Sequence, residues 1–181
     1  MNIKHTAIEG CFLLEPNIIK DDRGFFMESF NQRKFEALTG VETTFVQDNM
    51  SHSTYGVIRG LHAQAGEHAQ AKLVSVLLGE VIDVVVDIRP DSATYGKVVT
   101  ALLNDVHRHQ LFVPRGCLHG FAVLSEQATF FYKCDNFYNK ASEIGVKYDD
   151  PALQIDWRIP VNEHIISSKD AQLPLLKDVT L

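Results

Sequence analysis

The sequence predicts an all-β fold, a barrel or sandwich of the jelly-roll kind with a few short peripheral helices. Short runs rich in aromatic and β-branched residues recur along the chain, and turn signals such as Arg89-Pro90-Asp91-Ser92 separate them. Only one segment carries convincing helix signals. The 181 residues are enough for a sizeable core, and we expect a single domain over residues 1–181.

The expected strands are distributed over most of the chain. They cover residues 24–30, 43–47, 71–78, 81–88, 97–103, 110–113, 120–124 and 128–137. Gly79-Glu80 lies between two of these runs and predicts a hairpin that joins them.

The expected helix covers residues 31–38. Asn31 is a suitable N-cap, Phe35 and Leu38 form an apolar edge, and Gly40 can end the helix. Beyond residue 149 the chain becomes more polar and is expected to pack on the barrel as loops and a short helix.

Composition limits the class of protein. The formal net charge is −6 and no basic block is present, which argues against a general nucleic-acid-binding protein but allows an anionic small molecule to bind. Three cysteines without C-x-x-C spacing are typical of reduced thiols in the cytosol. The N-terminus has no signal-peptide core, and the longest apolar stretch, residues 74–88, is interrupted and too short to span a bilayer. These features predict a cytoplasmic protein without a membrane partner.

The run Arg59-Gly60-Leu61-His62 is a candidate reaction site. Histidine titrates near pH 6.5 and can act as a general base, although a single histidine is more often structural. Asp170 is a candidate to orient its ring. Because side chains alternate along a strand, Arg59 and His62 face the same site only if the strand bulges near Gly60.

Other side chains are candidates with ordinary alternatives. Arg23, Arg59 and Lys72 suit phosphate, yet any one of them is more often an ordinary surface cation. His119 follows a turn and could contact a ligand or be a buried structural histidine. Tyr132 could donate a proton or simply pack in the core.

Metal binding by histidines is the competing chemistry for a β-barrel. His62, His68 and His119 could in principle form a three-histidine site, but the chain has no His-Glu-x-x-His run, and its His-x-His pair at residues 107–109 lies in a polar turn. No G-x-G-x-x-G run is present either. We therefore predict neither a metal nor a redox cofactor.

A set of motifs in order along the chain carries a family resemblance. They are Asp22-Arg23-Gly24-Phe25-Phe26-Met27-Glu28, Gln47-Asp48-Asn49, Arg59-Gly60-Leu61-His62, Ala69-Gln70-Ala71-Lys72-Leu73-Val74, Gly79-Glu80-Val81-Ile82-Asp83-Val84, Val113-Pro114, His119-Gly120-Phe121, Tyr132-Lys133, Asp149-Asp150-Pro151 and Ser168-Lys169-Asp170. With these motifs, from about residue 12 to residue 176, the sequence resembles the dTDP-4-dehydrorhamnose 3,5-epimerase family of the cupin superfamily.

The resemblance implies a cupin-type jelly-roll homodimer that uses no metal. It implies a substrate, dTDP-4-dehydro-6-deoxy-D-glucose, that is epimerised at C3 and C5 to dTDP-4-dehydro-L-rhamnose through enolate intermediates. The product would feed L-rhamnose synthesis for bacterial surface polysaccharides such as the lipopolysaccharide O-antigen.

The resemblance also implies roles for individual residues. In the catalytic set His62 is the base, Asp170 its partner, Tyr132 the acid on the opposite face and Lys72 the group that stabilises the enolate oxygen. Substrate contacts are implied for Arg23, Gln47, Asn49, Arg59 and His119, for Tyr138 beside the nucleobase, and for Phe26 and Glu28 from a second subunit.

Several positions depart from the family pattern near the expected sugar pocket: Ala63, the segment Ala65-Gly66-Glu67-His68, Ser75 and Cys117-Leu118. They keep alternatives open. One is an epimerase that inverts only C3 or accepts another 4-keto sugar nucleotide. Others are a non-catalytic cupin that binds sugar nucleotides and a metal-dependent cupin oxygenase or isomerase.

Overall fold

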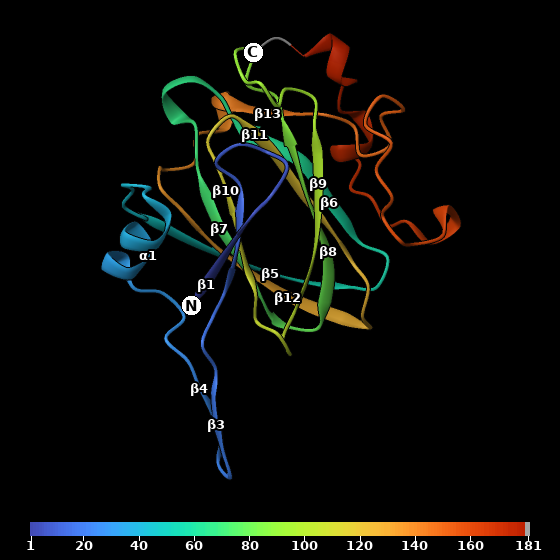
Figure 1. Ribbon diagram of the computed structural model, residues 1–181. Helices are drawn as coiled ribbons and strands as arrows, with labels where there is room; N and C mark the ends of the chain where they lie inside the picture. Colours follow the sequence, from blue (N-terminus) through green and yellow to red (C-terminus); the bar gives the residue numbers. More distant parts are fainter. Residues whose placement is uncertain (180–181) are drawn as a thin grey trace.

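Two antiparallel sheets face each other in the computed structural model, which describes residues 1–179 (Figure 1). This confirms the predicted all-β, cupin-type jelly roll with short peripheral helices. The six-stranded sheet runs in the order β1 (Asn2–His5), β2 (Phe12–Glu15), β10 (Gln110–Val113), β7 (Lys72–Leu78), β12 (Gln127–Cys134) and β5 (Gln47–Thr54). The five-stranded sheet runs in the order β13 (Glu143–Gly145), β6 (Ile58–Gln64), β11 (Cys117–Val123), β8 (Glu80–Asp87) and β9 (Val98–Asn104).

The expected hairpin at Gly79-Glu80 is wrong. β7 and β8 do follow each other across Gly79, but β7 pairs with β10 and β12 while β8 pairs with β9 and β11 in the other sheet. The chain therefore crosses between the sheets at this point. The expected strand at residues 43–47 is also wrong, since the strand here, β5, begins only at Gln47.

The helix confirms its predicted caps. α1 (Gln32–Thr39) begins after Asn31, whose side chain accepts a hydrogen bond from the backbone N–H of Lys34, and ends at Gly40 in the left-handed conformation. Its buried Phe35 packs with the rings of Phe12 and Phe112 against the six-stranded sheet.

The largest part of the core lies between the sheets. Val74 and Phe130 of the six-stranded sheet meet Val85 and Phe121 of the other in one buried cluster, and the rings of Phe121 and Phe130 stack 4.1 Å apart. This packing fixes the spacing of the two sheets, and with it the spacing of the side chains that each sheet presents to the other.

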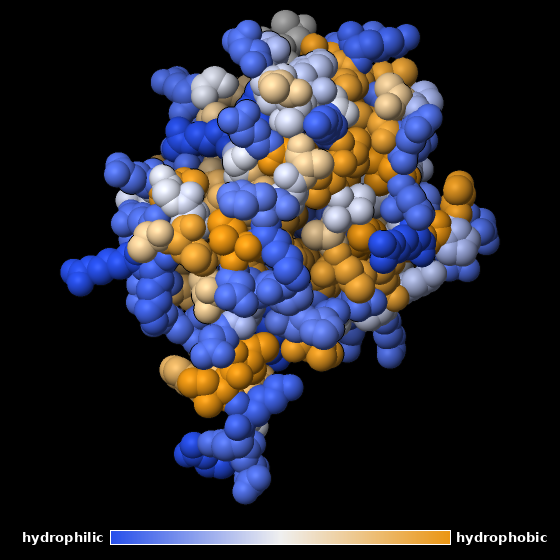
Figure 2. All heavy atoms as spheres, viewed as in Figure 1, coloured by the Kyte–Doolittle hydropathy of each residue, from blue (hydrophilic) through white to orange (hydrophobic). Residues whose placement is uncertain are grey.

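A two-stranded hairpin projects away from the sandwich. It consists of β3 (Ile19–Asp21) and β4 (Gly24–Phe26), and it extends from the lower end of the molecule in Figure 1. Ile19, Phe25 and Phe26 on it are exposed apolar residues, and Figure 2 shows an apolar surface on the part of the hairpin nearest the body. Such side chains are expected to be covered by another surface.

The C-terminal segment packs along the edge of the five-stranded sheet as predicted. Ile165 makes a parallel bridge with Val57, and its backbone N–H donates to the carbonyl oxygen of Gly56. Five short 3-10 helices complete the described structure: η1 (Gly66–His68), η2 (Lys140–Ser142), η3 (Val161–Glu163), η4 (Asp170–Gln172) and η5 (Leu176–Asp178). Among residues 1–179, no helix has the length and apolar character needed to cross a bilayer.

Candidate active site

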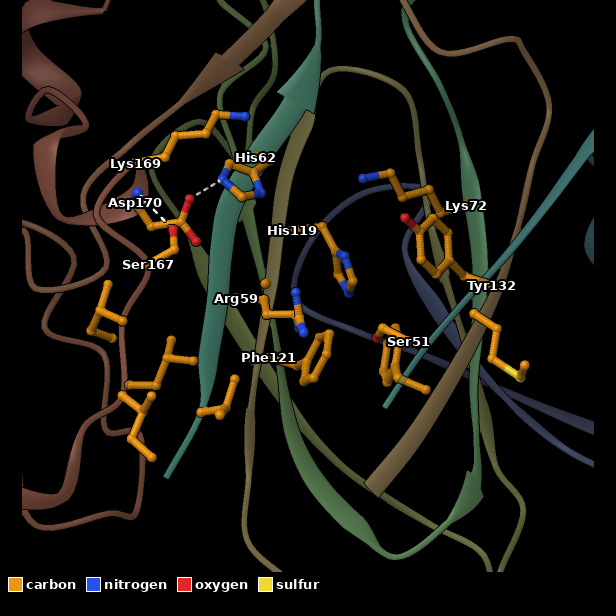
Figure 3. Close-up of a pocket in the computed structure, with 17 residues that line it drawn as sticks. Ser51, Arg59, His62, Lys72, His119, Phe121, Tyr132, Ser167, Lys169 and Asp170 are labelled. Atoms are coloured by element: carbon orange, nitrogen blue, oxygen red, sulfur yellow. Dashed lines mark hydrogen bonds and ion pairs between the residues drawn. The ribbon is translucent and has the colours of Figure 1, made fainter. Parts of the chain in front are cut away.

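A cavity of about 570 Å³ opens between the two sheets (Figure 3). Six of the predicted site residues line it: Arg59, His62, Lys72, His119, Tyr132 and Asp170. β6 and β11 of one sheet supply the arginine and the two histidines, whereas β7 and β12 of the other sheet supply the lysine and the tyrosine. Figure 3 shows Lys72 and Tyr132 across the cavity from His62. Groups on opposite sheets can therefore reach opposite faces of one bound molecule.

The strand irregularity required near Gly60 is present. Along β6 and β11, His62 pairs with His119 and Arg59 pairs with Phe121, so three residue steps on one strand match two on the other. Gly60 has φ of 120°, and a Cβ at that position would lie 2.7 Å from the Cα of Gly120. Only glycine allows this close approach, and the extra residue turns Arg59 and His62 toward the same cavity.

His62 is held by a carboxylate. Its Nε2 lies 2.8 Å from Oδ1 of Asp170, whose side chain is only 7% exposed. The backbone N–H of Gly60 donates to the second carboxylate oxygen of Asp170. The backbone N–H of Asp170 itself donates to Ser167 Oγ. The ring is thereby fixed with Nδ1 free to face the cavity, which is the arrangement of an oriented general base.

Lys72 and Tyr132 lie together on the other sheet, with the Lys72 ammonium 5.8 Å from the centre of the tyrosine ring. Burial lowers the pKa of Lys72, although the nearby Cys134 and Asp83 favour its charged form. Burial raises the pKa of the Tyr132 hydroxyl. The tyrosine therefore keeps its proton and can act as an acid, and the lysine is a cation placed where a substrate oxygen can reach it.

A polar hollow of about 250 Å³ continues from the cavity and shares His62, Lys72 and Tyr132 with it. The predicted residues Gln47, Asn49 and Tyr138 line this hollow. Gln47 connects the other two, because its Nε2 donates to Asn49 and its Oε1 accepts the backbone N–H of Tyr138. This hydrogen-bonded edge offers amide groups and an aromatic ring to a ligand that extends out of the cavity.

Sequence reasoning missed a carboxylate that closes this hollow. Glu143 accepts a hydrogen bond from the Tyr138 hydroxyl at 2.8 Å and also pairs with Lys169. Burial pushes the pKa of Glu143 upward, but these two donors outweigh burial and leave it lowered. Glu143 lies on β13 opposite Gln64 of β6, the strand that holds His62, so only the strand pairing could have revealed this position.

A second missed carboxylate lies behind the cavity. Asp83 on β8 is completely buried, and its two oxygens lie 2.9 and 3.1 Å from Nε2 of His119. The sequence did carry a signal, since Asp83 interrupts a strand of apolar residues. His119 is thus both buried and part of the cavity wall, which combines the two alternatives left open for it.

Three predicted contacts lie away from the cavity in this chain. Arg23 pairs with Asp21 at the tip of the projecting hairpin, and its side chain is 90% exposed. Phe26 is 69% exposed, and Glu28 binds Lys34. A single chain does not bring these residues to His62.

Within residues 1–179, histidine, cysteine, aspartate and glutamate side chains form no group of three or more that could hold a metal ion. His68, a member of the hypothetical three-histidine site, lies instead against the side chain of Asn139.

An oriented base on one wall, with a protonated acid and a cation on the opposite wall, characterises an acid–base enzyme on a cupin-type scaffold. The model of the family described as dTDP-4-dehydrorhamnose 3,5-epimerase matches residues 5–178. The chain belongs to this family.

Individual relatives cover nearly the whole chain. The dTDP-4-dehydrorhamnose 3,5-epimerase of Escherichia coli K12 is 48% identical, covering 99% of this chain and 96% of its own length. The crystal structure of the enzyme of that name from Elizabethkingia anophelis superposes with a TM-score of 0.95. The two sequences are 53% identical, and the match covers 98% of this chain and 97% of that chain. A third relative is the dTDP-6-deoxy-D-glucose-3,5-epimerase of Legionella pneumophila, solved in complex with dTDP-4-keto-L-rhamnose. It is 46% identical with a TM-score of 0.95, and the match covers 99% of this chain and 94% of that chain.

Proposed function

We propose that this chain epimerises dTDP-4-dehydro-6-deoxy-D-glucose at C3 and C5 and forms dTDP-4-dehydro-L-rhamnose. The family membership supports the substrate and the reaction. The observation that carries the mechanism is the placement of His62 and Tyr132 on opposite sheets that enclose one cavity.

The first step removes a proton from carbon. C3 and C5 both flank the C4 ketone, so each C–H bond is acidified by the same carbonyl group. His62 takes the proton on Nδ1, the electron pair of the C–H bond moves into the ring, and charge develops on the C4 oxygen. The Lys72 ammonium stabilises that charge in a site where burial strengthens electrostatic interactions.

The second step returns a proton to the opposite face. The electron pair of the enolate takes the hydroxyl proton of Tyr132, and the centre is inverted. The tyrosine recovers a proton from solvent and His62 releases one, so the net reaction changes only stereochemistry. The same pair can serve both carbons if the sugar turns about its bond to the diphosphate between the two inversions.

The nucleotide is proposed to lie along the outer part of the site. Arg59, whose Nε donates to Ser53, presents a guanidinium at the cavity wall and suits the diphosphate. Gln47, Asn49 and Tyr138 line the adjoining hollow and suit the nucleoside.

We further infer a homodimer in which the projecting hairpin completes the partner's site. Arg23, Phe26 and Glu28 lie on or beside that hairpin and do not reach the cavity of their own chain. An exposed arginine and an exposed aromatic ring provide a diphosphate contact and a stacking surface in the second copy.

Mixing two inactive variants tests this arrangement. A subunit with His62→Ala and a subunit with Arg23→Ala each lack one part, but a mixed dimer has one complete site. Random exchange would give about a quarter of the wild-type activity, because half of the dimers are mixed and each has one working site. No recovery of activity, in a preparation shown by mass spectrometry to contain mixed dimers, would contradict the shared site.

The function itself is tested by solvent exchange. The protein is incubated with the 4-keto sugar nucleotide in deuterated water, and the product is examined by NMR. Deuterium at both C3 and C5 with formation of the L-rhamno product supports the proposal. Label at C3 alone identifies the C3-only alternative, and binding without exchange identifies a non-catalytic cupin.

The product would supply L-rhamnose for surface polysaccharide, and we place the reaction in the cytoplasm. The three free, buried cysteine thiols support that compartment.

A further inference from the structure

Asp83 carries a charge that the strand around it cannot satisfy. It is completely buried on β8, where its neighbours Ile82 and Val84 are also fully buried and apolar. A buried carboxylate persists only where it is paired and hydrogen-bonded. Its hydrogen-bond partner among the described residues is the ring of His119.

The geometry of this contact indicates which group donates. Nε2 of His119 lies almost equally far, 2.9 and 3.1 Å, from the two oxygens of Asp83. One N–H shared between both oxygens of an ionised carboxylate gives this pattern, whereas a protonated carboxyl would donate from a single oxygen. The near-equal distances favour a proton on Nε2.

The other ring nitrogen is left for the cavity. Within the described chain, Nδ1 of His119 has no hydrogen-bond partner, and the ring forms part of the cavity wall beside His62 and Lys72 (Figure 3). With Nε2 protonated, Nδ1 of a neutral imidazole is a hydrogen-bond acceptor. Four other polar groups of the wall can donate: Arg59, Lys72, Tyr132 and Lys169.

Asp83 also acts on Lys72. Its charge favours the charged form of the Lys72 ammonium. The same carboxylate therefore interacts with both Lys72 and the ring of His119.

The arrangement has a counterpart in the same cavity. His62 also uses Nε2 to contact an aspartate, Asp170, and His62 and His119 are directly opposite each other on β6 and β11. The cavity thus holds two histidine–aspartate pairs side by side, with each Nδ1 left for the ligand.

We propose that Asp83 is a positioning residue that holds His119 with Nε2–H toward the protein and Nδ1 toward the substrate, where it accepts a hydrogen bond from a sugar hydroxyl. The role in catalysis rests on the proposed epimerase function, but the state of the ring does not. His119 contacts the sugar, and Asp83 positions it without touching the substrate.

Nitrogen NMR of the histidine rings tests the proposal without substrate. The full-length protein is labelled with ¹⁵N-histidine, and His119 is assigned by the signal that disappears in His119→Asn. We expect a protonated Nε2 and an unprotonated Nδ1 in the wild type, and loss of that preference in Asp83→Asn, since an amide can either donate or accept. A proton on Nδ1 in the wild type, or an unchanged spectrum in the variant, would overturn the proposal.

A matched control separates this effect from general damage. Asp87 is also completely buried on β8 and pairs with Arg89, away from the cavity. Asp87→Asn should lower thermal stability yet leave the His119 signals unchanged. If it shifts them as Asp83→Asn does, the effect is structural and the proposal fails.

A double-variant cycle tests whether Asp83 acts through His119. Asp83→Asn alone should lower kcat by about tenfold or more, as expected when an oriented histidine loses its carboxylate. In the His119→Asn background the same change should lower kcat by a clearly smaller factor, because the ring it positions is absent and only its effect on Lys72 remains. Equal losses in both backgrounds would show that Asp83 acts by another route. If the wild type proves inactive on the 4-keto sugar nucleotide, the proposed function fails while the NMR result still stands.

Discussion

The contact between His62 and Asp170 allows a quantitative prediction for Asp170→Asn. The substitution keeps the size of the side chain but removes its charge at a site where Oδ1 lies 2.8 Å from Nε2 and only 7% of the side chain is exposed. A hydrogen bond to a charged group contributes about 1.5–3 kcal/mol. If this contact acts fully in the transition state, its loss lowers kcat by about 10- to 150-fold.

The assay is steady-state turnover of the 4-keto sugar nucleotide, monitored by NMR of the product. KM should change by less than about threefold, because the phosphate and nucleoside contacts proposed for Arg59 and Gln47 are untouched. Asp156→Asn is the control, since Asp156 is an exposed aspartate in the same C-terminal segment that also accepts a backbone hydrogen bond. A kcat unchanged in Asp170→Asn, or a loss confined to KM, would refute the role of Asp170 as the partner of the base.

Two further predictions concern pH and stability. Burial lowers the pKa of Lys72, so this lysine loses its proton at a lower pH than an exposed lysine would. Burial raises the pKa of Tyr132, so the tyrosine keeps its proton over the same pH range. The alkaline fall in kcat should therefore move to higher pH in Lys72→Arg, and an unmoved pH–rate profile would contradict this assignment. Phe12 is 2% exposed, and its ring stacks on that of Phe112 with 4.8 Å between the ring centres. Phe12→Ala should therefore lower the free energy of unfolding, measured by urea denaturation, by about 3–5 kcal/mol. A loss below about 1 kcal/mol would show that the packing of these two rings does not support the fold.

Local signals in the sequence predicted local structure well. Asn31 and Gly40 bound the helix because their capping hydrogen bonds involve residues only three or four positions away. Residues 110–113 form the expected strand. At Gly79-Glu80, however, the local hairpin signal failed, because β7 pairs with β10 and β12 while β8 pairs with β9 and β11, so the two flanking strands find other partners later in the chain.

The site shows the same division between local and distant information. The need for an irregular strand at Gly60 followed from side-chain alternation alone. By contrast, the contact of Asp170 with His62 spans 108 residues, so Asp170 could be named as a candidate but sequence spacing alone could not place it beside His62. Asp83 was overlooked because a single charged residue in an apolar strand does not reveal its partner, which is on a neighbouring strand.

Position-resolved exchange in two variants tests the central claim that His62 and Tyr132 act from opposite faces. In deuterated water, His62→Ala should abolish exchange at both C3 and C5. Tyr132→Phe should still exchange these protons, since the base remains, but should form little inverted product because the opposite face lacks its acid. Exchange at a near-normal rate in His62→Ala, or normal inversion in Tyr132→Phe, would contradict the account.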